Sequence, residues 1–121
     1  MRFDPELKGE TPAAADSVRG PWKRVVRAVL DLAGPEAQLV RHAETPWASV
    51  TFSGARHTIV LGFEGEQAMD AADLFIFALP DHEFTISGRL VADATIRAVD
   101  QSMQPSPRVQ VEAELLVLDD V

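Results

Sequence analysis

FTISGRLVADATIRA, residues 84–98, alternates apolar and polar side chains, and this period of two predicts a β-strand with one buried face. RVQVEAELLVL, residues 108–118, alternates in the same way and follows Pro105 and Pro107. The two stretches predict a long antiparallel hairpin in the last third of the chain. Gly88 interrupts the first stretch, so we expect either a bulge or a turn there.

Two segments upstream of this hairpin have helical periodicity. GPWKRVVRAVLDLAGP, residues 20–35, begins with a proline at the first helical position and ends in Gly-Pro, as helices commonly do. Its core-facing stripe consists of Trp22, Val25, Val26, Val29, Leu30 and Ala33. A second helix is expected from residue 65 or 66 to Leu79, where Pro80 discourages further helix, although the apolar run 74–79 also suits a strand.

Three short strands are expected between the helices, at residues 37–43, 47–53 and 57–63. Gly54-Ala55 is interpreted as a two-residue hairpin loop. The order α-β-β-β-α-β-β then predicts an α+β fold, in which an antiparallel sheet of about five strands carries two helices on one face.

The composition is that of one folded domain. The chain has 121 residues, of which 46% are hydrophobic and 25% charged, enough for a single core. Residues 1–16 have few apolar anchors, so we expect a flexible N-terminal arm before a single α+β domain at residues 17–121. No stretch resembles a signal peptide or a membrane span, which predicts a cytoplasmic protein without a membrane partner.

Charge and cysteine content exclude several classes of function. The absence of cysteine rules out disulfide scaffolds, thiolate nucleophiles, iron–sulfur clusters and cysteine-based zinc sites. The net charge is −8, and beyond residue 35 there are five basic against fourteen acidic residues. Because phosphate backbones are bound by Lys and Arg, we expect no nucleic-acid partner.

The sequence contains none of the glycine-rich, nucleophile-elbow, calcium-loop or two-histidine zinc motifs. The weak catalytic candidates are Asp81, His82 and Glu83, three titratable residues in one expected loop. The favoured alternative is that they solvate the connection between a helix and a strand.

Two other polar groups are candidate sites. With Gly54-Ala55 as the turn, His42 and His57 lie roughly 13 Å apart, at ~3.3 Å per residue. We therefore expect no shared metal site and no cofactor. The basic face of the first helix, formed by Arg19, Lys23, Arg24 and Arg27, suits an acidic or phosphorylated ligand, but self-neutralisation or simple solvation is favoured.

Surplus apolar residues favour a non-catalytic interaction module that forms a homodimer. Val91, Val99, Leu116 and Leu118 fall on the polar face of the last hairpin, and Met69 and Phe77 fall outside the buried arc of the second helix. The expected interface residues are Met69, Phe77, Val91, Leu116 and Leu118, with contact through a sheet edge or the Val91/Leu116 face.

Two alternatives remain open at this stage. One is a small-molecule-binding protein or small enzyme with a pocket between helices and sheet near His82 and Glu83. The other comes from the element order alone, which resembles the core of type III secretion chaperones. That resemblance implies an acidic dimer that binds an extended segment of another protein.

Overall fold

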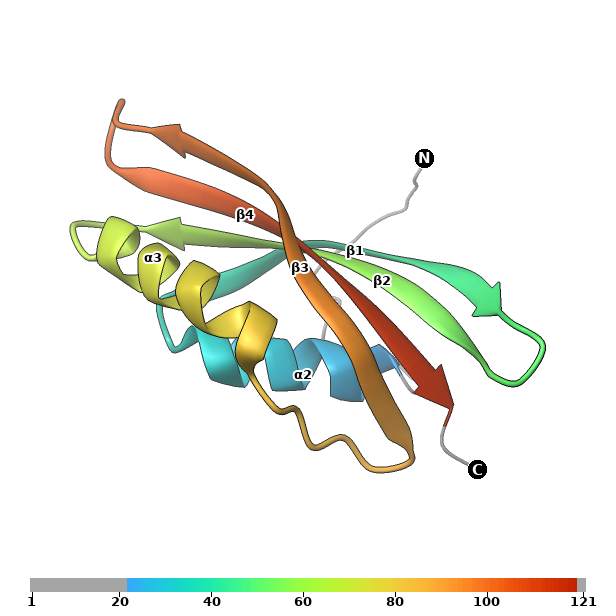
Figure 1. Cartoon of the computed structure of the whole chain (residues 1–121). Coiled ribbons are helices and arrows are strands. Elements are labelled where there is room, and N and C mark those ends of the chain that lie inside the picture. The colour runs from blue at the N-terminus through green and yellow to red at the C-terminus, as the bar shows by residue number, and fades with distance from the viewer. Residues whose placement is uncertain (1–21, 120–121) are drawn as a thin grey trace.

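The computed structural model describes residues 22–119, which form two helices packed on a sheet (Figure 1). The elements are α2 (Trp22–Ala33), β1 (Ala37–Ala48), β2 (Ser53–Glu64), α3 (Ala68–Ala78), the 3₁₀ helix η1 (Leu79–Asp81), β3 (Arg89–Ser102) and β4 (Arg108–Asp119). The α+β class with an antiparallel sheet is confirmed. The expected arm at residues 1–16 and Arg19 lie outside the described residues. No helix within residues 22–119 is long and apolar enough to cross a bilayer.

Within residues 22–119 the sheet has four antiparallel strands in the order β1-β2-β4-β3, not about five. β1 continues through Pro46, so the three expected strands are a two-strand hairpin. Proline is tolerated there because β1 is an edge strand and one of its sides needs no ladder hydrogen bond. The element order is therefore α-β-β-α-β-β, and the order that resembled the secretion chaperones is not present.

The β1–β2 turn is organised by a serine side chain. Ser49 Oγ accepts hydrogen bonds from the backbone N–H groups of Thr51 and Phe52, at 3.3 and 3.0 Å. Hydroxyls commonly stabilise turns in this way. Gly54 and Ala55 lie inside β2, so the prediction that they form the turn is wrong.

Both helices cover the same face of the sheet, as predicted (Figure 1). Val25 and Val29 of α2 and Phe75 of α3 are at most 1% exposed. Alternate residues of β2 and β4 complete the core beneath them: Ile59, Leu61, Phe63, Val111, Ala113 and Leu115. The helical stripes read from the sequence therefore face the core.

β3 departs from the predicted alternation at three points. Gly88 lies in a turn with φ 75°, a conformation that glycine adopts without strain, and the strand begins only at Arg89. The pairing register then shifts after Val91 and again after Ile96. Val91 consequently pairs with Val117 on the helix-covered face, and its expected place on the polar face is wrong.

The outer face of the sheet is covered by charged side chains. Arg41 pairs with Glu112 at 3.8 Å, while Arg56 and Arg97 approach Glu114 at 4.0 and 3.7 Å. Exposed ion pairs contribute at most about 1 kcal/mol each. Their effect here is to make the outer face polar.

Candidate metal centre

A β-bulge in β1 turns His42 toward the helices. The register with β2 shifts between Leu39 and Arg41, which leaves Val40 without a cross-strand partner. In an uninterrupted strand, residues 40 and 42 would share a face. The bulge separates them, so that Val40 is half exposed and His42 pairs with Ile59 on the core side.

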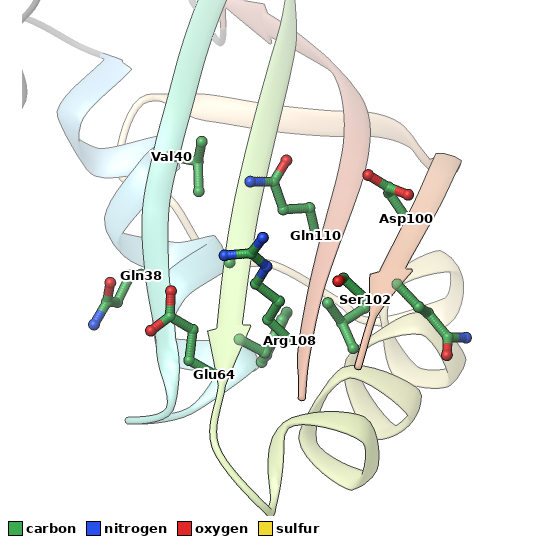
Figure 2. A pocket seen from close by; sticks show the side chains of 11 residues that line it. Gln38, Val40, Glu64, Asp100, Ser102, Arg108 and Gln110 are labelled. Atoms are coloured by element: carbon green, nitrogen blue, oxygen red, sulfur yellow. The ribbon is translucent and has the colours of Figure 1, made fainter. Parts of the chain in front are cut away.

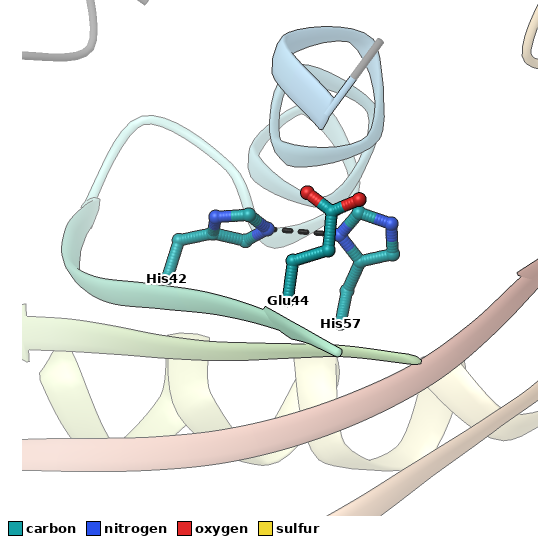
Figure 3. Close-up of side chains that lie close together, drawn as sticks. All are labelled: His42, Glu44 and His57. Atoms are coloured by element: carbon teal, nitrogen blue, oxygen red, sulfur yellow. Dashed lines mark hydrogen bonds between the residues drawn. The ribbon is translucent and has the colours of Figure 1, made fainter. Parts of the chain in front are cut away.

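Three potential metal ligands meet on this side of the β1–β2 hairpin (Figure 3). Glu44 is the cross-strand partner of His57 and lies two residues after His42, so all three residues share one face. His42 Nε2 and His57 Nδ1 form a hydrogen bond of 2.8 Å. One ligand atom from each residue lies within 4.8 Å of the other two.

The prediction that the two histidines lie about 13 Å apart, at ~3.3 Å per residue, is wrong. It followed from placing the turn at Gly54-Ala55. The observed turn, four residues earlier in the hairpin, shifts the register and brings the rings together.

The two imidazoles are held between the sheet and the start of α2. The Trp22 ring stacks on His42, with centroids 4.3 Å apart and an interplanar angle of 14°. His57 is only 4% exposed. His42 is partly exposed and Glu44 is exposed, so the cluster is buried at His57 and open to solvent on the carboxylate side.

Burial keeps both imidazoles neutral at physiological pH. Desolvation, followed by the proximity of His57, lowers the pKa of His42 to about 3. Desolvation also lowers the pKa of His57, where Glu44 acts in the opposite direction and Arg89 acts in the same one. Neutral imidazoles are the form that binds metal ions.

The spacing fits a transition metal after a small adjustment. Zinc–nitrogen bonds of about 2.0–2.1 Å in tetrahedral geometry place neighbouring ligand atoms about 3.3–3.4 Å apart. The two ring nitrogens would have to separate by about 0.5 Å, and the carboxylate of Glu44 would have to move closer by side-chain rotation. Imidazole ligands select zinc, copper, nickel or iron over calcium and magnesium.

The three catalytic candidates lie on the surface between α3 and β3. Asp81, His82 and Glu83 are all exposed, and neither of the two cavities described below is lined by them. The ring of His82 packs edge-on against Phe84, with centroids 4.5 Å apart. The structure thus gives these residues a solvated surface position.

The five interface candidates lie in different environments. Val91 and Met69 pack against the core, and Leu118 is 7% exposed. Leu116 is partly buried on the outer face, where it pairs with Arg56 and Asp93. Phe77 alone projects into solvent, with 83% of its surface exposed.

Two cavities in the described part of the chain are lined by other residues than the histidine cluster. The first, of about 310 Å³, lies on the outer face at the end of β2 and the start of β4 (Figure 2). Arg108 projects into it among Glu64, Asp100 and Gln110. Mixed charges of this kind favour no one class of ligand. The second, of about 470 Å³, lies between α2 and residues 85–87.

A local signal for the cluster exists in the sequence. His42-x-Glu44 has the spacing that puts two side chains on one face of a strand, and His57 follows on the next strand. The signal is weak because it requires the correct hairpin register.

Comparisons with protein families, with curated proteins and with solved structures found no match to this chain.

Proposed function

We propose that this protein binds a divalent transition-metal ion through His42, Glu44 and His57. The observation that carries the proposal is the 2.8 Å approach of two imidazole nitrogens beside a carboxylate on the same sheet face. Two histidines and one glutamate form a known zinc ligand set.

The environment supports this assignment. Both imidazoles are neutral, so no buried positive charge has to be displaced before an ion binds. The hydrogen bond between the rings places a proton on one of the facing nitrogens, and that proton must move to the other nitrogen of its ring. Because Glu44 is exposed, water can complete the coordination sphere on its side.

The direct test is calorimetric titration of the full chain, freed of metal with a chelator, with Zn²⁺ and Ni²⁺. We expect one equivalent to bind, with Mg²⁺ and Ca²⁺ giving no heat. At a free zinc concentration of 100 times Kd, the ion stabilises the fold by about 2.7 kcal/mol. This corresponds to a rise in Tm of about 10 °C or more.

The chain offers a matched control for this titration. It has three histidines and no cysteine, so His82→Ala removes the one imidazole outside the cluster. This variant should bind zinc as the wild type does. Glu44→Gln alters only an exposed side chain and should weaken binding at least 10-fold while the protein remains folded.

His57→Ala is a stronger test but risks unfolding, because His57 is buried. His42→Asn is therefore measured beside it, with circular dichroism as the check on folding. The proposal is overturned if a folded wild type gives no heat with zinc, or if His82→Ala loses binding and Glu44→Gln keeps it.

A further inference from the structure

The surface of the helix layer that faces away from the sheet has two chemically different halves. On α2, the side opposite Val25 and Val29 carries three exposed basic residues, Lys23, Arg24 and Arg27, and one exposed acidic residue, Asp31. The arrangement is that of an amphipathic helix with a basic outer stripe.

α3 presents the complementary stripe. The side opposite its buried residues Ala72 and Phe75 carries two carboxylates and two large apolar side chains, namely Asp70, Asp73, Leu74 and Phe77. Leu74 is 71% exposed and Phe77 is 83% exposed. A helix that is apolar on its outer side as well as its inner side is typical of an element with a second packing partner.

A groove beside α2 suits such apolar side chains. It has a volume of about 470 Å³ and lies between α2 and residues 85–87. Ala28 and Ile86 contribute apolar surface. The charged lining is basic on balance, with Lys23, Arg24 and Arg27 against Asp31. Arg24 Nη1 donates a hydrogen bond to the Ser87 carbonyl oxygen at 3.3 Å, which ties the two walls together.

We propose that the helix layer is the contact surface of a symmetric homodimer, in which α3 of each copy packs against α2 of the other. A two-fold axis running between the two helix layers produces this arrangement, and the same contact then forms twice. Phe77 and Leu74 of one copy enter the groove of its partner. Asp70 and Asp73 meet the basic stripe of the partner's α2.

Charge complementarity selects a second copy as the occupant. The basic stripe lies on α2 and the apolar-acidic stripe on α3 of the same chain. The two helices are neighbours in one layer (Figure 1). The alternative pairing of α3 with α3 would bring Asp70 and Asp73 toward their own copies, and like charges in contact are unfavourable.

The other surfaces are less suited to this contact. The outer sheet face carries the Arg–Glu ion pairs described above. Both edge strands are irregular, since β1 has a bulge and Pro46 and β3 has two bulges. Bulges and prolines on edge strands are features that hinder pairing between sheets.

The size of the layer predicts a weak dimer. Helices of 12 and 11 residues at 1.5 Å per residue present a surface about 18 Å long and about 20 Å wide. This is smaller than the ~800 Å² per partner of a standard interface. We expect a micromolar Kd, so the molar mass must be measured up to several hundred micromolar chain.

The first experiment is sedimentation equilibrium on the full chain across this range. Phe77→Glu places a charge at the centre of the contact and should weaken dimerisation at least about 30-fold. Val50→Glu is the matched control, because Val50 is fully exposed in the β1–β2 turn, which lies away from both helices (Figure 1). It should change Kd by less than about 3-fold.

A charge exchange tests the pairing of α2 with α3. Arg27→Asp and Asp73→Arg should each weaken the homodimer, since each places like charges together at both contacts. An equimolar mixture of the two variants should form a heterodimer with affinity near that of the wild type, because both contacts again join opposite charges.

Three results would overturn the proposal. One is a wild type that stays monomeric at several hundred micromolar, with the circular dichroism of a folded protein. Another is a dimer that tolerates Phe77→Glu but is dissociated by Leu116→Glu, which would place the contact on the sheet. The third is a mixture of the two charge variants that shows no recovery.

Discussion

Gly54→Ala tests the close approach of β2 and β4, which fixes the end of the sheet next to His57. A methyl group on Gly54 would overlap the carbonyl oxygen of Val117 and lie 2.8 Å from Leu118 Cα, where real contacts of this kind stay above 3.0 Å. These are backbone atoms, so only separation of the two strands relieves the overlap. Overpacking of this kind costs about 1–3 kcal/mol, and one or two ladder hydrogen bonds add about 1 kcal/mol each.

We therefore expect Gly54→Ala to lower the free energy of unfolding by about 2–5 kcal/mol. The matched control is Gly62→Ala in the same strand, where the new methyl group meets only Val40 Cγ2, at 3.1 Å. A side chain can move away, and replacing glycine restricts the unfolded chain, so the control should stay within about 1 kcal/mol of the wild type. Urea denaturation measures both values. Equal stabilities for the two variants would refute the close approach of the strands.

Two further predictions concern stability. In the presence of a chelator, the unfolded chain binds protons at His42 and His57 below pH 6.5 while the folded chain does not, because burial lowers both pKa values. Stability should therefore be full above pH 6.5. Through His42 it should fall by up to about 1.4 kcal/mol per pH unit as the pH decreases toward about 3, and His57 should add to the loss in the same direction. A flat urea midpoint between pH 7 and pH 5 would contradict this. Phe75→Ala should lower the free energy of unfolding, measured by urea denaturation, by about 3–5 kcal/mol, because Phe75 is 1% exposed in the core. A decrease below about 1 kcal/mol would contradict this, since it would mean that neighbouring side chains fill the cavity left by the ring.

The helices were predictable because their signals are local. The stripe of Val25, Val26 and Val29 repeats at helical spacing, and these residues are at most 4% exposed in the structure. Proline and glycine mark both ends of this segment in the sequence. For α3, the buried arc through Ala72 and Phe75 was sufficient, despite the high apolar content of the rest of the helix.

The register of the strands was not predictable from the same pattern. Gly54-Ala55 has the composition of a tight turn, whereas the observed turn depends on one hydroxyl, that of Ser49. The position of the turn decides which residues of β1 lie opposite His57. The prediction of regular alternation in β3 was wrong for a related reason, since each bulge changes which residues face the core. Val91, before the first bulge, and Val99, after the second, both pair with core-face residues of β4.

The bulge at Val40 explains why a histidine cluster forms at this position. With Leu39 directed inward, an uninterrupted strand would direct Arg41 inward as well and bury a guanidinium against α2. An unpaired charge in such a place is strongly unfavourable. The extra residue instead leaves Arg41 on the outer face, where its Nη2 lies 3.8 Å from Glu112 Oε1. The same shift directs His42 and Glu44 toward His57, so the burial cost of an arginine selects the register on which the candidate metal centre depends.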